Sequence, residues 1–143
     1  MKTIFSICYI LLIAIGCGQK KSNTMDQNKP LAGDFKVQSV QGKEVPESME
    51  VNFVLDTLES KVAGQSACNR FFGSYLNEGE ELSFGKLAST MMACPEDQMQ
   101  MEQEFLSAME QVGSYRWNDN QIELLDAEDQ QVLIVASTNS KTE

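Results

Sequence analysis

Turn-forming residues interrupt the chain about every eight to ten residues between Leu31 and Ser137, and this spacing limits its possible folds most strongly. The segments between the turns are short, and several alternate apolar and polar residues as half-buried strands do. We expect strands at 35–40, 50–55, 60–65, 71–76, 81–87, 114–117, 121–125 and 131–136, with residues 90–93 continuing the fifth strand past a bend at Gly85. Such a series predicts an antiparallel meander that closes into a small barrel or a strongly coiled sheet.

One stretch, at about 95–112, has helical periodicity instead. Its apolar residues form a single stripe, which consists of Met101, Phe105, Ala108, Met109 and Val112. Pro95 suits the first turn of this helix, and Gly113 is expected to cap its C-terminus. The stripe is expected to pack on the sheet, and the alternative is a methionine-lined binding groove. The fold class is therefore mainly β: a small antiparallel barrel-like sheet of about eight short strands with one packed helix.

The N-terminus has the layout of an export signal, in which Lys2 precedes the apolar run 4–16. This run is too short to cross a hydrocarbon core, which needs roughly 20 apolar residues. It ends in Ala-Ile-Gly-Cys, which resembles the bacterial lipobox and implies cleavage after residue 16 and a diacylglycerol on Cys17. Residues 17–30 then form the lipidated cysteine and a polar tether. The alternative is a plain secretory peptide. Because Gly18 follows the cysteine instead of Asp, we expect an envelope protein anchored in the outer membrane and facing the periplasm.

The four cysteines separate into different classes. Cys8 leaves with the signal and Cys17 carries lipid, so Cys68 and Cys94 remain as an isolated pair in an exported protein. A disulfide is the expected state of that pair. Two buried free thiols are an alternative, and half of a metal site is another, although a pair of thiolates falls short of the usual four zinc ligands.

Composition excludes several classes of function. The chain has no histidine, so it has no Ser-His-Asp or Cys-His catalytic set. Its net charge of −10 argues against nucleic-acid binding. The predicted turns are acidic, with carboxylates at Glu78, Glu80, Glu81, Asp126, Glu128 and Asp129. These residues most simply keep the protein soluble, and their spacing does not match a calcium-binding loop. We expect no enzyme activity, no metal and no cofactor.

Two stretches resemble the signature of the META/HslJ domain: residues 62–75, which read VAGQSACNRFFGSY, and residues 82–95, which read LSFGKLASTMMACP. The matching motif residues are Gly64, Cys68, Asn69, Phe71, Gly73, Tyr75, Thr90, Met92 and Cys94. Phe35 stands where the family usually has Trp, and Ala67 replaces a Gly. The resemblance implies a small β-rich domain over residues 31–137, followed by a polar tail at 138–143. It also implies an exported lipoprotein connected with stress or envelope tolerance, and it brings no catalytic residues.

Three motif positions have physical interpretations. Asn69 suits a tight turn because it tolerates left-handed backbone, and Gly73 would allow a close approach of two segments. The Ala67 backbone is either not left-handed or mildly strained. Arg70 is expected to pair with a local carboxylate or turn carbonyls, and the alternative is an anion or partner contact.

The expected function is that of a monomeric, non-enzymatic envelope lipoprotein that contacts an unknown envelope protein. The alternative is a lipocalin-like carrier that holds a small apolar ligand inside the barrel.

Overall fold

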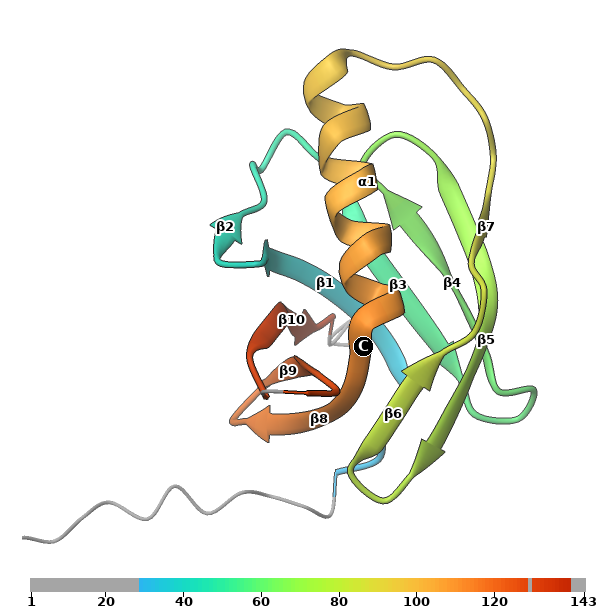
Figure 1. The fold of residues 1–143 in the computed structure, drawn as a ribbon, viewed down its shortest axis with the longest axis vertical. Coiled ribbons are helices and arrows are strands. Elements are labelled where there is room, and N and C mark those ends of the chain that lie inside the picture. The colour runs from blue at the N-terminus through green and yellow to red at the C-terminus, as the bar shows by residue number, and fades with distance from the viewer. Residues whose placement is uncertain (1–28, 129, 140–143) are drawn as a thin grey trace, which may run out of the picture.

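The computed structural model describes residues 29–128 and 130–139, so the predicted signal, Cys17 and residues 18–28 of the tether lie outside the described residues. Figure 1 shows one helix lying against the described strands. The strands are β1 (Gly33–Val40), β2 (Lys43–Glu44), β3 (Val51–Asp56), β4 (Lys61–Ser66), β5 (Arg70–Glu78), β6 (Glu81–Phe84), β7 (Ala88–Ser89), β8 (Val112–Asn118), β9 (Gln121–Asp126) and β10 (Val132–Thr138). The helix α1 covers Glu96–Gln111.

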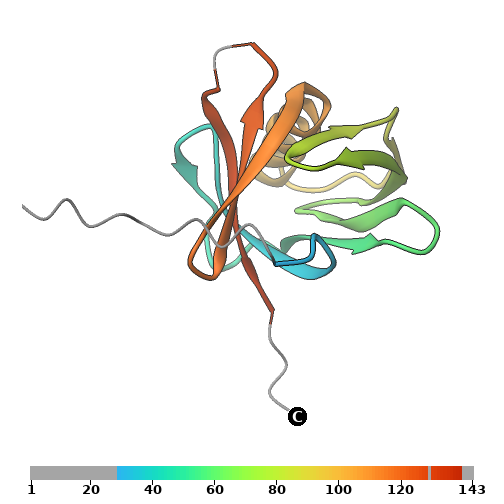
Figure 2. The ribbon, with the colours of Figure 1, turned by 90° about the horizontal axis from the view of Figure 1, so that it is seen from below.

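The sheet closes into an antiparallel barrel (Figure 2). Its eight strands follow the order β10-β9-β8-β6-β5-β4-β3-β1, and β1 pairs with β10 to complete the circle. The two short extra strands, β2 and β7, pair with β1 and β5. The predicted small antiparallel barrel with one helix is therefore confirmed, and closure leaves few strand edges open to other chains.

Alternation within the strands decides which side chains enter the core. In β3, Val51, Phe53 and Leu55 are buried, whereas Asn52 and Val54 lie on the outer surface. Phe53 stacks on Phe35 of β1 with ring centroids 4.9 Å apart. The two-residue period of a strand thus places one face inside the barrel and the other outside, as the sequence pattern predicts.

The helix packs its apolar stripe into the core, which confirms the packing interpretation of Met101, Phe105, Ala108 and Met109. The Phe105 ring meets the Phe71 ring of β5 edge to face, with centroids 5.4 Å apart. No helix among the described residues is long and apolar enough to cross a membrane.

The expected C-terminal cap at Gly113 is wrong. Val112 is already extended, and the chain passes from α1 directly into β8. Gly113 is needed for space instead, because a Cβ atom there would lie 2.5 Å from the Ala127 Cα atom.

The expected strand continuation at 90–93 is also wrong. Strand β6 ends at Phe84, β7 covers only Ala88–Ser89, and residues 90–95 have no strand partner. The side chain of Asn69, in the turn before β5, instead accepts hydrogen bonds from Thr90 and Met92 of this segment.

Candidate functional site

A half-buried carboxylate joins the helix to the turn between β4 and β5. Glu102 of α1 accepts hydrogen bonds from the Ser66 hydroxyl at 2.6 Å and from the Asn69 backbone N–H at 2.7 Å, both on Oε2. Its Oε1 accepts a third bond from Asn69 Nδ2 at 3.0 Å. Both carboxylate oxygens are therefore used as acceptors, and such charge-assisted bonds are stronger than neutral ones.

The other end of the Asn69 side chain holds the segment before the helix. Asn69 Oδ1 accepts bonds from the Thr90 hydroxyl at 2.9 Å and the Met92 backbone N–H at 2.8 Å. These contacts replace strand pairing in this segment and explain why it is irregular. We call Ser66, Asn69, Thr90, Met92 and Glu102 the motif cluster.

Asn69 lies in the tight turn after β4, as the sequence predicts, but it is not the left-handed residue of that turn. Its φ is not positive, and its side chain is buried, whereas the neighbouring Ala67 has a φ of 78°. The left-handed position of the turn is therefore Ala67, and it is strained because a Cβ atom there costs about 1–2 kcal/mol.

Ala67→Gly should consequently stabilise the protein. Relief of the left-handed strain exceeds the extra backbone entropy of glycine, so we expect a gain of about 0.5–1 kcal/mol in the free energy of unfolding. Thermal unfolding followed by circular dichroism measures the change. The matched control is Ala63→Gly in β4, where φ is not positive and the same change should destabilise. A loss of stability in Ala67→Gly would contradict the prediction.

The remaining cysteine pair lies beside the motif cluster. The Cys68 and Cys94 sulfurs are 2.09 Å apart and the Cα atoms 5.9 Å apart, which is the geometry of a disulfide. Within the described part of the chain, no group of three or more His, Cys, Asp or Glu side chains could hold a metal.

The other motif residues serve packing. A Cβ atom on Gly64 would lie 2.0 Å from the Asn52 carbonyl oxygen, and one on Gly73 would lie 2.7 Å from Leu87 Cδ2. Phe71 and Tyr75 are buried in the core. The signature therefore describes how this side of the barrel is built.

The outer side of the same strands has an unusual surface, which we call the binding face. Cross-strand pairing aligns Val54 of β3, Ala63 of β4, Phe72 of β5 and Ala88 of β7 into one outward apolar row. The Phe72 side chain is 59% exposed and Val54 is 41% exposed. A neighbouring outward row is polar and consists of Lys36, Asn52, Gln65 and Arg70. A continuous apolar row on an exposed sheet surface is typical of an interaction site.

A hollow of about 390 Å³ lies within the binding face, and its lining includes Val54, Ala63, Gln65 and Arg70. Among the residues that the structure describes, no carboxylate pairs with the Arg70 guanidinium, so the expected local carboxylate partner is not observed. The alternative interpretation, a contact with an anion or a partner, remains a hypothesis.

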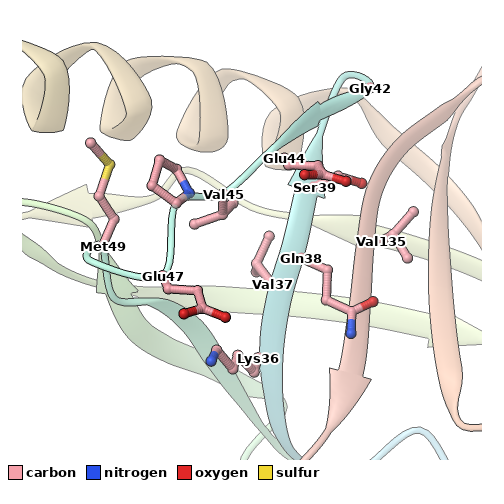
Figure 3. Close-up of a pocket in the computed structure, with 11 residues that line it drawn as sticks. Lys36, Val37, Gln38, Ser39, Gly42, Glu44, Val45, Glu47, Met49 and Val135 are labelled. Carbon is pink, nitrogen blue, oxygen red and sulfur yellow. The ribbon is translucent and has the colours of Figure 1, made fainter.

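A larger cavity of about 610 Å³ adjoins the Lys36 end of the binding face. Figure 3 shows that its lining comes from β1, β2, the loop after β2 and Val135 of β10. The lining is mixed, with the charged side chains Lys36, Glu44 and Glu47 beside Val45 and Met49.

The acidic turn residues Glu78, Glu80, Glu81 and Glu128 are exposed, and Asp126 is half-buried. Asp129 lies outside the described residues. These turns close separate hairpins, β5–β6 and β9–β10, so the two groups belong to different elements of the barrel.

Sequence reasoning missed the role of Glu102. The signal for it is weak, because Glu102 lies next to Met101 and three residues before Phe105, at the border of the apolar stripe. A carboxylate at such a border can face the solvent or the core, and only the tertiary structure decides which.

Comparison with known proteins agrees with this fold. The family model of the META domain matches residues 29–139. An NMR structure of a protein from Burkholderia xenovorans superposes with a TM-score of 0.61 at 24% identity, covering 77% of this chain and 83% of that one. A second NMR structure superposes with a TM-score of 0.62 at 24% identity, covering 82% of this chain and 97% of the other. Both likenesses concern the fold. No curated protein matches the sequence.

The family match spans every described strand and the helix, and it includes the motif cluster, the cysteine pair and the tightly packed Gly64. The chain belongs to the META domain family.

Proposed function

We propose that this protein is a non-enzymatic envelope lipoprotein, anchored through Cys17, that works by contacting a protein partner through the binding face. The observation that carries the proposal is the outward apolar row of Val54, Ala63 and Phe72, which crosses three barrel strands in register. Exposed apolar side chains cost solubility, and a contiguous row of them is most simply maintained because a partner covers it. The family's connection with stress or envelope tolerance supports a role for that contact in protecting the cell envelope.

The packing of the core favours this proposal over a carrier function. Large side chains fill the core, and Phe35, Phe53, Phe71, Phe105 and Met109 are each less than 2% exposed. A carrier of an apolar ligand needs an enclosed space of roughly 300 Å³ or more, which side chains of this size would occupy.

Photo-crosslinking in the native cell tests the contact. A benzophenone amino acid in place of Phe72 should give a protein adduct, whereas the same amino acid in place of Leu58 should not. Leu58 is the matched control because it is apolar and 95% exposed but belongs to the β3–β4 turn. Equal crosslinking at both positions, or none at Phe72, would overturn the proposed function.

The anchor makes a separate prediction. Protein purified from membranes should begin at Cys17 and carry the mass of attached acyl chains, because two or more chains are needed for stable anchoring. Intact mass spectrometry measures this increment, and Cys17→Ser should abolish it and release the protein from the membrane fraction. An unmodified Cys17 in the membrane-purified protein would contradict the anchor.

A further inference from the structure

The binding face differs in charge from the rest of the domain. Three basic residues, Lys43, Lys61 and Arg116, pair with carboxylates, and Lys29 lies over the Trp117 ring. In the described part of the chain, the basic residues with neither a carboxylate nor a ring partner are Lys36, Arg70 and Lys86. Two of them, Lys36 and Arg70, end the polar row of the binding face. Cations without partners on an acidic protein attract a negatively charged ligand to that place.

The polar row has a defined length. Lys36 pairs in register with Asn52, Asn52 with Gln65, and Gln65 with Arg70. Three strand spacings of about 4.8 Å therefore separate the backbones at its two ends, or about 14 Å in total. An extended segment of about four residues covers that distance.

Besides Glu44 and Glu47, which line the cavity next to Lys36, two acidic residues lie at this surface and limit where a carboxylate can bind. Glu50 lines the hollow, and its carboxylate accepts a bond from Asn52 Nδ2 at 2.9 Å. Asp34 is opposite Val54 at the β1 end of the apolar row. The positive positions are thus the two ends of the polar row, with an amide-lined centre between them.

The apolar row runs alongside, displaced by two residues along each strand, or about 7 Å. Ala63 and Phe72 are its central members, next to Gln65 and Arg70. Met91 and Met92 extend the apolar surface near Arg70, because the Thr90 backbone N–H donates to the Arg70 carbonyl. Methionine side chains adapt to differently shaped partners.

We propose that the binding face recognises an extended, acidic segment of a partner protein with carboxylates at positions i and i+4 and a large apolar side chain at i+2. In an extended chain these three side chains point to the same side. The carboxylates reach Arg70 and Lys36, where the guanidinium can bind one of them in bidentate fashion. The central side chain lies between β3 and β4 and leans about 7 Å sideways onto Val54 and Ala63. This proposal rests on the proposed function, since it names the chemistry of the partner.

Synthetic pentapeptides test it on the full ¹⁵N-labelled chain by NMR titration. The probe is an acetylated peptide with Glu at both ends, Phe in the centre and Thr between them. Binding should move the amide signals of β3, β4 and β5 around the polar row. A peptide with Lys in place of Glu, and one with Ala in place of Phe, should each bind about tenfold more weakly, as expected for the loss of a charge-assisted bond or of a buried aromatic ring.

Variants locate the site. Arg70→Gln should weaken binding of the probe about tenfold because it removes one charge-assisted contact. The matched control is Arg116→Gln, which changes the net charge equally but lies on β8, away from the face, and should leave binding unchanged. An unchanged melting temperature shows that Arg70→Gln still folds. Equal weakening by both variants, equal binding of the Lys peptide, or no binding of the probe would each overturn the proposal.

Vesicles separate this partner from a membrane surface. Binding of the chain to phosphatidylglycerol vesicles that requires Arg70, without binding of the acidic probe, would replace the peptide proposal with a lipid one. A crosslink at Phe72 without probe binding would leave the proposed function standing and remove this inference. Probe binding without a crosslink would leave this inference standing and remove the proposed function.

Discussion

Glu102→Gln should lower the free energy of unfolding by about 2–4 kcal/mol, although the new side chain has nearly the same shape. Glu102 accepts bonds from Ser66 and Asn69 on both of its oxygens. Glutamine has one acceptor oxygen and one NH2 group in place of the two carboxylate oxygens. In either orientation, its NH2 group would face a donor. At least one polar hydrogen is then left without an acceptor. Urea denaturation of the full chain measures the loss.

The control for this prediction is Glu104, two residues further along the same helix. Glu104 accepts bonds from Lys43 at 2.6 Å and from Gln100 at 3.1 Å, but at the protein surface. The hydrogen bond from Lys43 holds the pKa of Glu104 below its ordinary value of 4.5, so any stability it contributes is present above that pH and lost on acidification. Glu104→Gln should change stability little, because water replaces exposed partners. Equal losses in both variants would show that the part-buried setting of the Glu102 hydrogen bonds is unimportant.

Strand alternation and helical periodicity were enough to predict most of the fold. The buried residues of β3 and the apolar stripe of α1 are local patterns. Once the period of such a pattern is known, it determines which side chains face the core. The two errors, at residues 90–93 and at Gly113, have non-local causes. Asn69 accepts a hydrogen bond from the first segment, and Ala127 packs against Gly113. Neither contact leaves a periodic signal in the sequence.

The binding face could be anticipated only in pieces. The outward positions of Val54, Ala63 and Phe72 follow from the pattern of each strand by itself. Their alignment into a row depends on the register between strands, and a shift of one residue would move each side chain to the opposite face. Arg70 illustrates the same limit, because a lone arginine in a sequence does not reveal whether a carboxylate lies nearby.

The motif cluster and the binding face are two sides of one turn. Ser66 and Asn69 point inward to Glu102, while Gln65 and Arg70 point outward. The Arg70 backbone N–H also donates to the Thr90 hydroxyl at 3.2 Å. These hydrogen bonds therefore fix the backbone from which Arg70 extends. Glu102→Gln should consequently weaken probe binding as well as stability, whereas Glu104→Gln should affect neither.

Replacing both cysteines of the pair, Cys68→Ala with Cys94→Ala, should cost about 3.5 kcal/mol of unfolding free energy. The bond spans 26 residues, and the loss comes mainly from the greater freedom of the unfolded chain once this loop is open. Either single alanine variant should lose the same amount, because each breaks the same bond. Reduction of the natural protein with a phosphine should bring it to the stability of the double variant and should not affect that variant. Two titratable thiols in the untreated protein would contradict the bond.

The losses from the disulfide and from Glu102 should not add. The disulfide joins Cys68 of the β4–β5 turn to Cys94, which lies two residues before the start of α1. Glu102 of α1 holds the same turn through its hydrogen bonds. Without the disulfide, the turn can move and let water reach the donors that Glu102→Gln leaves unpaired. The triple variant should therefore be more stable than the sum of the separate losses predicts, by about 0.5–3 kcal/mol, as is usual for residues in one network. Strict additivity would mean that the disulfide and the carboxylate hold the turn independently.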